Sequence, residues 1–163
     1  DWDDAAEQLR SRSGDVHPKY DRAEWLRFAK RICRETDAGV EFDYDMAIAE
    51  PFNAGYCHCS MCRKAHGAAF GTYARVERTD FALVSGADAI ASYRSSPEVV
   101  RTFCNRCGSN LQFISDKRPG SFALALGTLD DDPGVQASFH IFVASKAPWF
   151  QIADDLPRHA GAP

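Results

Sequence analysis

The stretch CHCSMCRK, from Cys57 to Lys64, places three cysteines, one histidine and two cations in eight residues. Apolar packing does not require sulfur at this density, so the stretch indicates metal binding. A second pair, Cys104 and Cys107 in FCNRCG, has the C-x-x-C spacing of a zinc knuckle, in which a tight turn directs both sulfurs toward one point. Five of the six cysteines therefore have metal-ligand spacing rather than the scattered spacing of a disulfide framework.

Two zinc ions divide these cysteines better than one, because a single ion would have one sulfur too many. Cys57, Cys59 and Cys62 supply three ligands from one loop and leave a fourth position open, which is typical of a catalytic zinc. The alternative is that His58 or His66 completes the tetrahedron, and the site is then structural. If the loop is extended, His58 should point away from a metal that its two neighbours hold.

The ligand type also restricts the chemistry. Three thiolates give zinc a negatively charged first shell, which makes it a poor activator of water. Soft sulfur ligands favour exchange with a fourth soft ligand, such as the thiol of a substrate. The site therefore predicts sulfur chemistry rather than hydrolysis.

Length and composition predict one globular domain in the cytoplasm. The chain has 163 residues, of which 45% are apolar and 26% charged. Its net charge of −4 and the absence of a basic stripe argue against a nucleic-acid partner. No apolar run is long enough to span a membrane, and DWDDAAEQLR is too acidic for a signal peptide.

The order of predicted elements is helical first and then mainly β. Residues 3–12 are strong helix formers, and Asp21 with Glu24 forms a capping box before apolar residues at helical spacing. After Gly39 the alternation in VEFDYDM predicts a strand. Short strands separated by turn signals follow in AAFGTYARV, FALV, AIASYR, EVVRTF, NLQFIS, SFALAL and SFHIFV. The pattern predicts mainly antiparallel β sheets with one or two N-terminal helices.

Four ordered motifs, CHCSMCRKAHGAAFGTYARV, FCNRCGSNLQF, ALGTLDD and HIFVASKAPW, resemble the glutathione-dependent formaldehyde-activating enzyme family, also called the centromere protein V domain family. The resemblance covers about residues 40–157. It implies a zinc-stapled fold of the β-tent kind. Outside the resemblance, the residues themselves predict a helical extension over residues 1–39 and a loose tail over residues 158–163. The resemblance also implies a catalytic zinc on Cys57, Cys59 and Cys62 and a structural zinc that uses Cys104 and Cys107.

The function that this resemblance implies is that of a zinc-dependent carbon–sulfur lyase. The substrate would be the adduct of a small thiol, glutathione above all, with formaldehyde or a related carbonyl. The alternative is a non-catalytic, zinc-stapled module that binds a small ligand or a peptide. Solvent or substrate at the fourth position of the Cys57 zinc would favour the enzyme, and a protein side chain there would favour the module. A methionine sulfoxide reductase is disfavoured, because no cysteine follows Cys107 to act as nucleophile.

The chain departs from the family pattern upstream, where a C-x-C pair should supply the other ligands of the structural zinc. The sequence has RICRETDAG there, with Glu35 and Asp37 at the positions of the missing cysteines and Cys33 two residues earlier. In an extended strand these three residues share one face. The best remaining ligand set is Cys33, Glu35, Cys104 and Cys107, unless the helix from Asp21 carries Cys33 away.

Other residues near the motifs have a possible role in the site. His66 is a candidate proton shuttle, against the alternative of a structural histidine. Arg63 and Lys64 could receive the carboxylates of glutathione or another anion, or form a solvated surface pair. His140 is interpreted as structural from the residues alone. Candidates for the wall of a substrate pocket are Phe70, Tyr73, Lys146 and Trp149. Nothing in the sequence predicts the oligomeric state.

Overall fold

The N-terminal part of the chain is a pair of helices, as predicted. Helix α1 spans Trp2–Ser13 and α2 spans Arg22–Ile32. The capping box is present, because Asp21 accepts from the backbone N–H of Glu24 and the Glu24 carboxylate accepts from that of Asp21. The computed structural model describes residues 1–13, 19–37, 39–42, 45–48, 51–130 and 132–162.

The chain leaves α2 directly into a small hairpin. Strand β1 (Cys33–Thr36) pairs antiparallel with β2 (Gly39–Phe42), and the hairpin packs with the two helices. The core of this unit consists of Ala5, Ala6, Leu9, Trp25, Ala29 and Cys33. The helix therefore stops before Cys33, and the thiol of Cys33 faces apolar neighbours.

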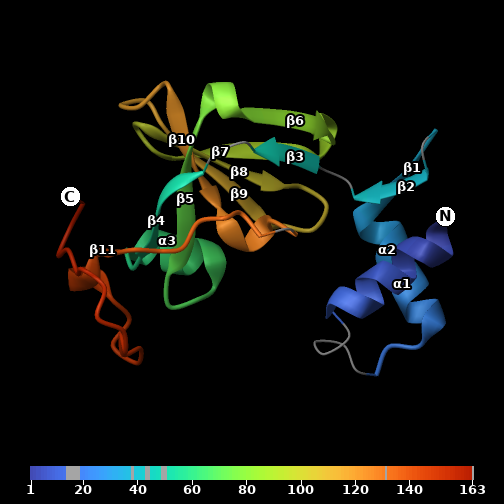
Figure 1. The fold of residues 1–163 in the computed structure, drawn as a ribbon, viewed down its shortest axis with the longest axis horizontal. Helices are drawn as coiled ribbons and strands as arrows, with labels where there is room; N and C mark the ends of the chain where they lie inside the picture. Colours follow the sequence, from blue (N-terminus) through green and yellow to red (C-terminus); the bar gives the residue numbers. More distant parts are fainter. Residues whose placement is uncertain (14–18, 38, 43–44, 49–50, 131, 163) are drawn as a thin grey trace.

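A seven-stranded sheet forms the main body of the chain (Figure 1). Its strand order is β11-β4-β5-β10-β9-β8-β7, with antiparallel pairs except for the parallel pair β11–β4. The bounds are β4 Phe52–Cys57, β5 Gly71–Glu77, β7 Ile90–Ser96, β8 Val99–Cys104, β9 Asn110–Ser115, β10 Ser121–Ala125 and β11 His140–Ile141. A separate two-stranded sheet pairs β3 (Asp45–Ile48) with β6 (Phe81–Ser85).

The mainly β fold that the sequence predicts is confirmed. The alternating stretch VEFDYDM is divided, because β2 pairs with β1 whereas β3 pairs with β6. Residues 43–44, between the two strands, lie outside the described residues. The strand expected in SFHIFV is shortened to His140–Ile141 and is followed by a 3₁₀ turn at Val143–Ser145.

The two faces of the main sheet have different chemistry. One face carries the apolar core of Val76, Phe122 and Leu124, against which Phe81 of β6 packs. The opposite face carries Tyr73 and the buried Arg101, and its covering helix is α3 (Ser60–His66). Figure 1 shows β3 and β6 on one side of the sheet and α3 on the other.

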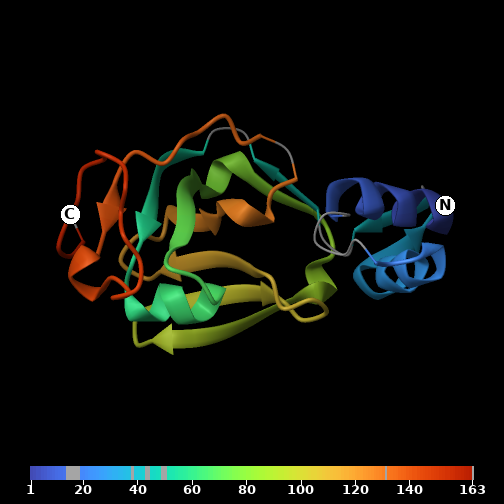
Figure 2. The same ribbon diagram turned by 90° about the horizontal axis from the view of Figure 1, so that it is seen from below.

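The two ends of the chain lie at opposite ends of the molecule. In both Figure 1 and Figure 2 the helical pair is at one end and the C-terminal segment at the other, beside β4 and α3. The segment after Pro157, expected to be loose, is hydrogen-bonded to the edge of the sheet: His159 N–H donates to the carbonyl of His140 over 2.9 Å. Among the described residues, no helix has the length and apolar character that crossing a membrane requires.

Candidate metal centre

Three elements position the sulfur loop. Cys57 is the last residue of β4, paired with Gly71 at the start of β5. Cys59 is the N-cap of α3, and its sulfur accepts from the backbone N–H of Cys62 over 3.3 Å, as N-cap side chains do. The helix is tied to the sheet by Asn110, whose amide donates to the Ala65 carbonyl over 2.5 Å. The loop is therefore a strand-to-helix turn fixed at both ends.

The Sγ atoms of Cys57, Cys59 and Cys62 all lie within 4.8 Å of one another, and none of the three cysteines is in a disulfide. Zn–S bonds of about 2.3 Å in tetrahedral geometry place two sulfurs roughly 3.8 Å apart, so this group fits a zinc ion. It is the only such group of three ligands among the residues that the structure describes. Cys57 and Cys62 are buried, whereas Cys59 is half-buried.

The electrostatics of the cluster also favour a cation. Hydrogen bonds from the Cys57 and Cys62 thiols lower the pKa of Cys59, and the hydrogen bond to Cys59 raises the pKa of Cys57 well above its usual range. One sulfur therefore becomes the anion and the others remain protonated, because adjacent thiolates repel each other. A bound metal removes this repulsion and allows all three sulfurs to ionise.

Neither histidine of the loop completes the metal site. The Nε2 atom of His58 lies 2.8 Å from Nδ1 of His140, and His58 does not belong to the group formed by the three sulfurs. The Nε2 atom of His66 lies 2.6 Å from the Tyr73 hydroxyl. In the described part of the chain no fourth protein ligand joins the three sulfurs, which leaves one tetrahedral position for another molecule.

A buried arginine stands next to the sulfur cluster. Arg101 of β8 is 2% exposed, and its Nη2 donates to the sulfur of Cys62 over 3.4 Å. Its Nη1 donates to the Tyr73 hydroxyl over 3.1 Å, and its guanidinium lies 5.1 Å from the centre of the Phe113 ring. A guanidinium in this position partly neutralises the thiolates.

Arg101, Tyr73 and His66 form one hydrogen-bonded chain. Burial raises the pKa of Tyr73 and, together with the charge of Arg101, lowers the pKa of His66. His66 is therefore neutral near pH 7, with a ring nitrogen available to the tyrosine hydroxyl. The chain depends on Gly71, because a Cβ there would meet the Tyr73 ring at 2.7 Å and the His66 ring at 2.8 Å.

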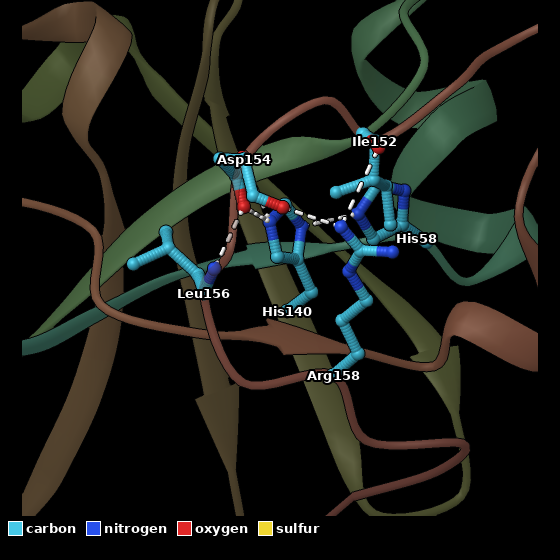
Figure 3. A network of polar contacts seen from close by, with 6 residues as sticks. All are labelled: His58, His140, Ile152, Asp154, Leu156 and Arg158. Atoms are coloured by element: carbon cyan, nitrogen blue, oxygen red, sulfur yellow. Dashed lines mark hydrogen bonds and ion pairs between the residues drawn. The ribbon is translucent and has the colours of Figure 1, made fainter.

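A second series of hydrogen-bonded side chains begins at His58 of the sulfur loop (Figure 3). His140 connects His58 to the carboxylate of Asp154, with Nε2 at 3.0 and 3.2 Å from the two oxygens. The hydrogen bond to His140 lowers the pKa of Asp154, and burial lowers the pKa of His58. His140 is thus a buried, hydrogen-bonded histidine, in agreement with its structural interpretation.

The candidate pocket residues lie in different settings. Phe70 packs edge-on against His58, with ring centres 5.4 Å apart. Lys64 is exposed and Arg63 half-buried, with no described partner for Arg63 Nε. The ammonium of Lys146 donates to the Ala147 carbonyl over 3.1 Å and to that of Phe150, and the Trp149 side chain is 70% exposed. The substrate-binding role of these residues remains a prediction.

The structure does not bring the predicted second set of ligands together. Cys104 is the last residue of β8 and is buried, whereas Cys107 is exposed in the turn between β8 and β9, the position that the sequence predicted for this pair. Cys33 lies instead in the core of the helical unit, and Glu35 is exposed and accepts from Trp2 Nε1 over 3.4 Å. Among the described residues, the knuckle has no third ligand within reach.

Sequence reasoning missed two residues around the loop: Arg101, which contacts Cys62, and Asp154, which is connected to His58 through His140. Arg101 is a lone cation inside the strand EVVRTF, three residues before Cys104, and that position was the available signal. Asp154 lies in the pair DDLP, and nothing distinguishes it in the sequence from its neighbour Asp155.

The fold and the sulfur cluster define a small, mainly β protein with a group of three cysteines that could hold a metal ion. The family described as glutathione-dependent formaldehyde-activating enzyme matches residues 32–145, and the chain belongs to that family. A Halomonas elongata protein with the provisional name glutathione-dependent formaldehyde-activating enzyme is 28% identical over 108 residues, which are 63% of this chain and 68% of that protein. A solved structure of a Rhodobacter sphaeroides protein is 20% identical, with a TM-score of 0.48 over 56% of this chain and 85% of that one.

Proposed function

We propose that the protein is a zinc-dependent carbon–sulfur lyase that forms or cleaves the adduct of a small thiol, such as glutathione, with formaldehyde or a related carbonyl. The observation that carries this proposal is the group of three cysteine sulfurs with no fourth described protein ligand. The membership of the chain in the glutathione-dependent formaldehyde-activating family supports the same substrate class. A zinc ion held there would supply a fourth, exchangeable position at which a thiol loses its proton.

The residues of the chain have separate parts in the proposed reaction. Cys57, Cys59 and Cys62 hold the ion, and Arg101 beside Cys62 reduces the negative charge that an incoming thiolate meets. In the forward direction the sulfur–carbon bond forms and the carbonyl π bond breaks, and the proton of the thiol ends on the carbonyl oxygen. We assign the handling of that proton to His66, held in place by Tyr73.

The test is the rate at which the purified, zinc-loaded protein exchanges formaldehyde with glutathione, followed by exchange NMR of the S-hydroxymethyl adduct. We expect the wild-type protein to accelerate the exchange. The matched control, Cys59→Ser, should show only the rate of the uncatalysed reaction. Glutathione binding without acceleration would instead support the binding module. The absence of both would contradict the proposed substrate class.

A further inference from the structure

The C-terminal segment is connected to the sulfur loop through a chain of three polar side chains (Figure 3). Asp154 accepts from His140 Nε2, and His140 Nδ1 lies 2.8 Å from His58 Nε2. The carboxylate is itself held by the backbone N–H of Leu156, which donates to Oδ1 over 3.1 Å. The chain thus runs from a half-exposed carboxylate to a histidine between two metal-ligand candidates.

The two imidazoles are enclosed by aromatic rings. His58 is 0% and His140 is 2% exposed, and their neighbours are Tyr56, Phe70 and Phe150 at ring-centre distances of 4.9–6.0 Å. Polar groups in such a setting are costly unless they are hydrogen-bonded. The hydrogen bond that begins at Asp154 therefore determines how both rings are oriented.

The direction of the hydrogen bonds follows from the acceptor at the outer end. A carboxylate only accepts, so His140 donates from Nε2. When His140 is neutral, its Nδ1 accepts from His58 Nε2–H. The remaining nitrogen of His58, Nδ1, is buried.

The fixed ring of His58 determines in which direction the neighbouring cysteine side chains point. Its ring is fixed on one side of the loop, so the side chains of Cys57 and Cys59 must leave on the other side. Its backbone N–H donates to the Ile141 carbonyl over 3.0 Å, which adds β11 to the same attachment. We infer that Asp154, His140 and His58 are positioning residues for the metal site, and that the C-terminal segment thereby determines how tightly the sulfur loop holds its ion.

The competing explanation is that the hydrogen bonds among Asp154, His140 and His58 only attach the C-terminal segment to the sheet. Backbone hydrogen bonds already attach that segment, including His140 N–H to the Pro157 carbonyl at 2.8 Å. Asp154 has a side chain that is 46% exposed, so its replacement leaves little cavity. A change confined to the metal site therefore separates the two explanations.

The experiment measures zinc affinity of the whole protein by competition with a chromophoric chelator. We expect Asp154→Ala to weaken zinc binding about tenfold, the lower end of what loss of such a supporting partner costs. Asp154→Asn keeps an oxygen that accepts from His140 and should stay near wild type. The matched control is Asp155→Ala, which removes the adjacent exposed carboxylate and should also bind as wild type does.

A second measurement follows the ring nitrogens of His58 and His140 by ¹⁵N NMR. In Asp154→Ala the resonances of both rings should move, and in Asp155→Ala neither should. Equal zinc affinities in Asp154→Ala and Asp155→Ala would overturn the inference. Weaker zinc binding in Asp154→Ala with unchanged His58 resonances would overturn it as well. So would an Asp154→Asn affinity as low as that of Asp154→Ala. The inference rests on the proposed metal site but not on its substrate, since zinc affinity and turnover are measured separately.

Discussion

At the scale of single residues, Arg101 gives the sharpest test of the sulfur site. Replacing it with Met removes the cation that donates to Cys62, so the thiolates around a bound ion lose a neighbouring positive charge. We expect zinc affinity to fall about tenfold in Arg101→Met and less in Arg101→Lys, which keeps the charge but not the planar donor. The measurement is chelator competition.

The control for Arg101 is Arg94→Met. Arg94 is exposed, donating to the Pro97 carbonyl over 2.8 Å and to Asp116 over 3.0 Å, both on the surface. Its replacement should leave zinc affinity unchanged. A loss of affinity as large as that of Arg101→Met would show that net charge, not the contact with Cys62, is responsible.

Tyr73 allows the hydrogen-bonded chain to be tested apart from the metal. Tyr73→Phe removes the hydroxyl between Arg101 and His66, so the buried Arg101 and the half-buried His66 each lose one hydrogen-bond partner. We expect unfolding in urea to require about 1–2 kcal/mol less free energy. Tyr93→Phe, at an exposed position on β7, should change it by less than about 0.5 kcal/mol.

The sequence could predict the three sulfurs of the loop because their spacing is local. The distance from Cys57 to Cys62 along the chain is short enough for one turn to bring all three together. Arg101 could not be predicted, because it lies 39 positions from Cys62 and reaches it only after the sheet has formed. The contact of Asp154 could not be predicted for the same reason, because Asp154 is 14 positions from His140 in a segment without regular structure.

At the scale of elements, α3 allows metal binding to be separated from folding. Cys59 is both a candidate metal ligand and the N-cap of this helix. Serine is one of the best N-cap residues, so Cys59→Ser removes the thiol and keeps the cap. We expect this variant to lose zinc while its metal-free melting temperature stays within a few degrees of the metal-free wild type.

Cys59→Ala is the matched comparison, because it loses the thiol and the cap together. It should be about 1 kcal/mol less stable than Cys59→Ser without metal. If Cys59→Ser is unfolded, the loop is a structural staple and the open-site interpretation fails.

The elements around the loop were also harder to predict than the rest. The capping box of α2 was readable because all its partners lie within four residues. Strand β4 carries Asn53 and Gly55, residues that weaken strand propensity, and is stabilised by pairing with β5 and β11. Helix α3 is a short segment that contains part of the cysteine motif. Its residues follow the spacing of metal ligands, so the sequence gives no clear helical pattern there.

At the scale of the whole molecule, the zinc content tests the placement of Cys33. Only one group of three ligands occurs in the described residues, and Cys33 belongs to the core of the helical unit. We therefore expect native mass spectrometry to find one tightly held zinc per chain, unchanged in Cys33→Ala. Two tightly held ions, one of them lost in Cys33→Ala, would restore the second site that the sequence predicted.

The helical unit and the main sheet have separate cores, which predicts that they can be weakened separately. Trp25 is buried in the core between α1 and α2 and does not belong to the sulfur loop. Trp25→Ala should destabilise the helical unit by about 3–5 kcal/mol. Zinc affinity should stay at the wild-type value, and a parallel loss of both would show that the two parts fold as one.

The bond between His58 and His140 joins residues 82 positions apart. Contacts between such distant positions form late, because a long loop must close before they contribute any stability. The three thiols of the loop lie within five positions of one another along the chain, so two of them can meet and be oxidised to a disulfide before that contact forms. Refolding in air without metal should therefore trap a cross-linked species, visible as a mass two units lower per bond, and a reductant or zinc added at the start should prevent it.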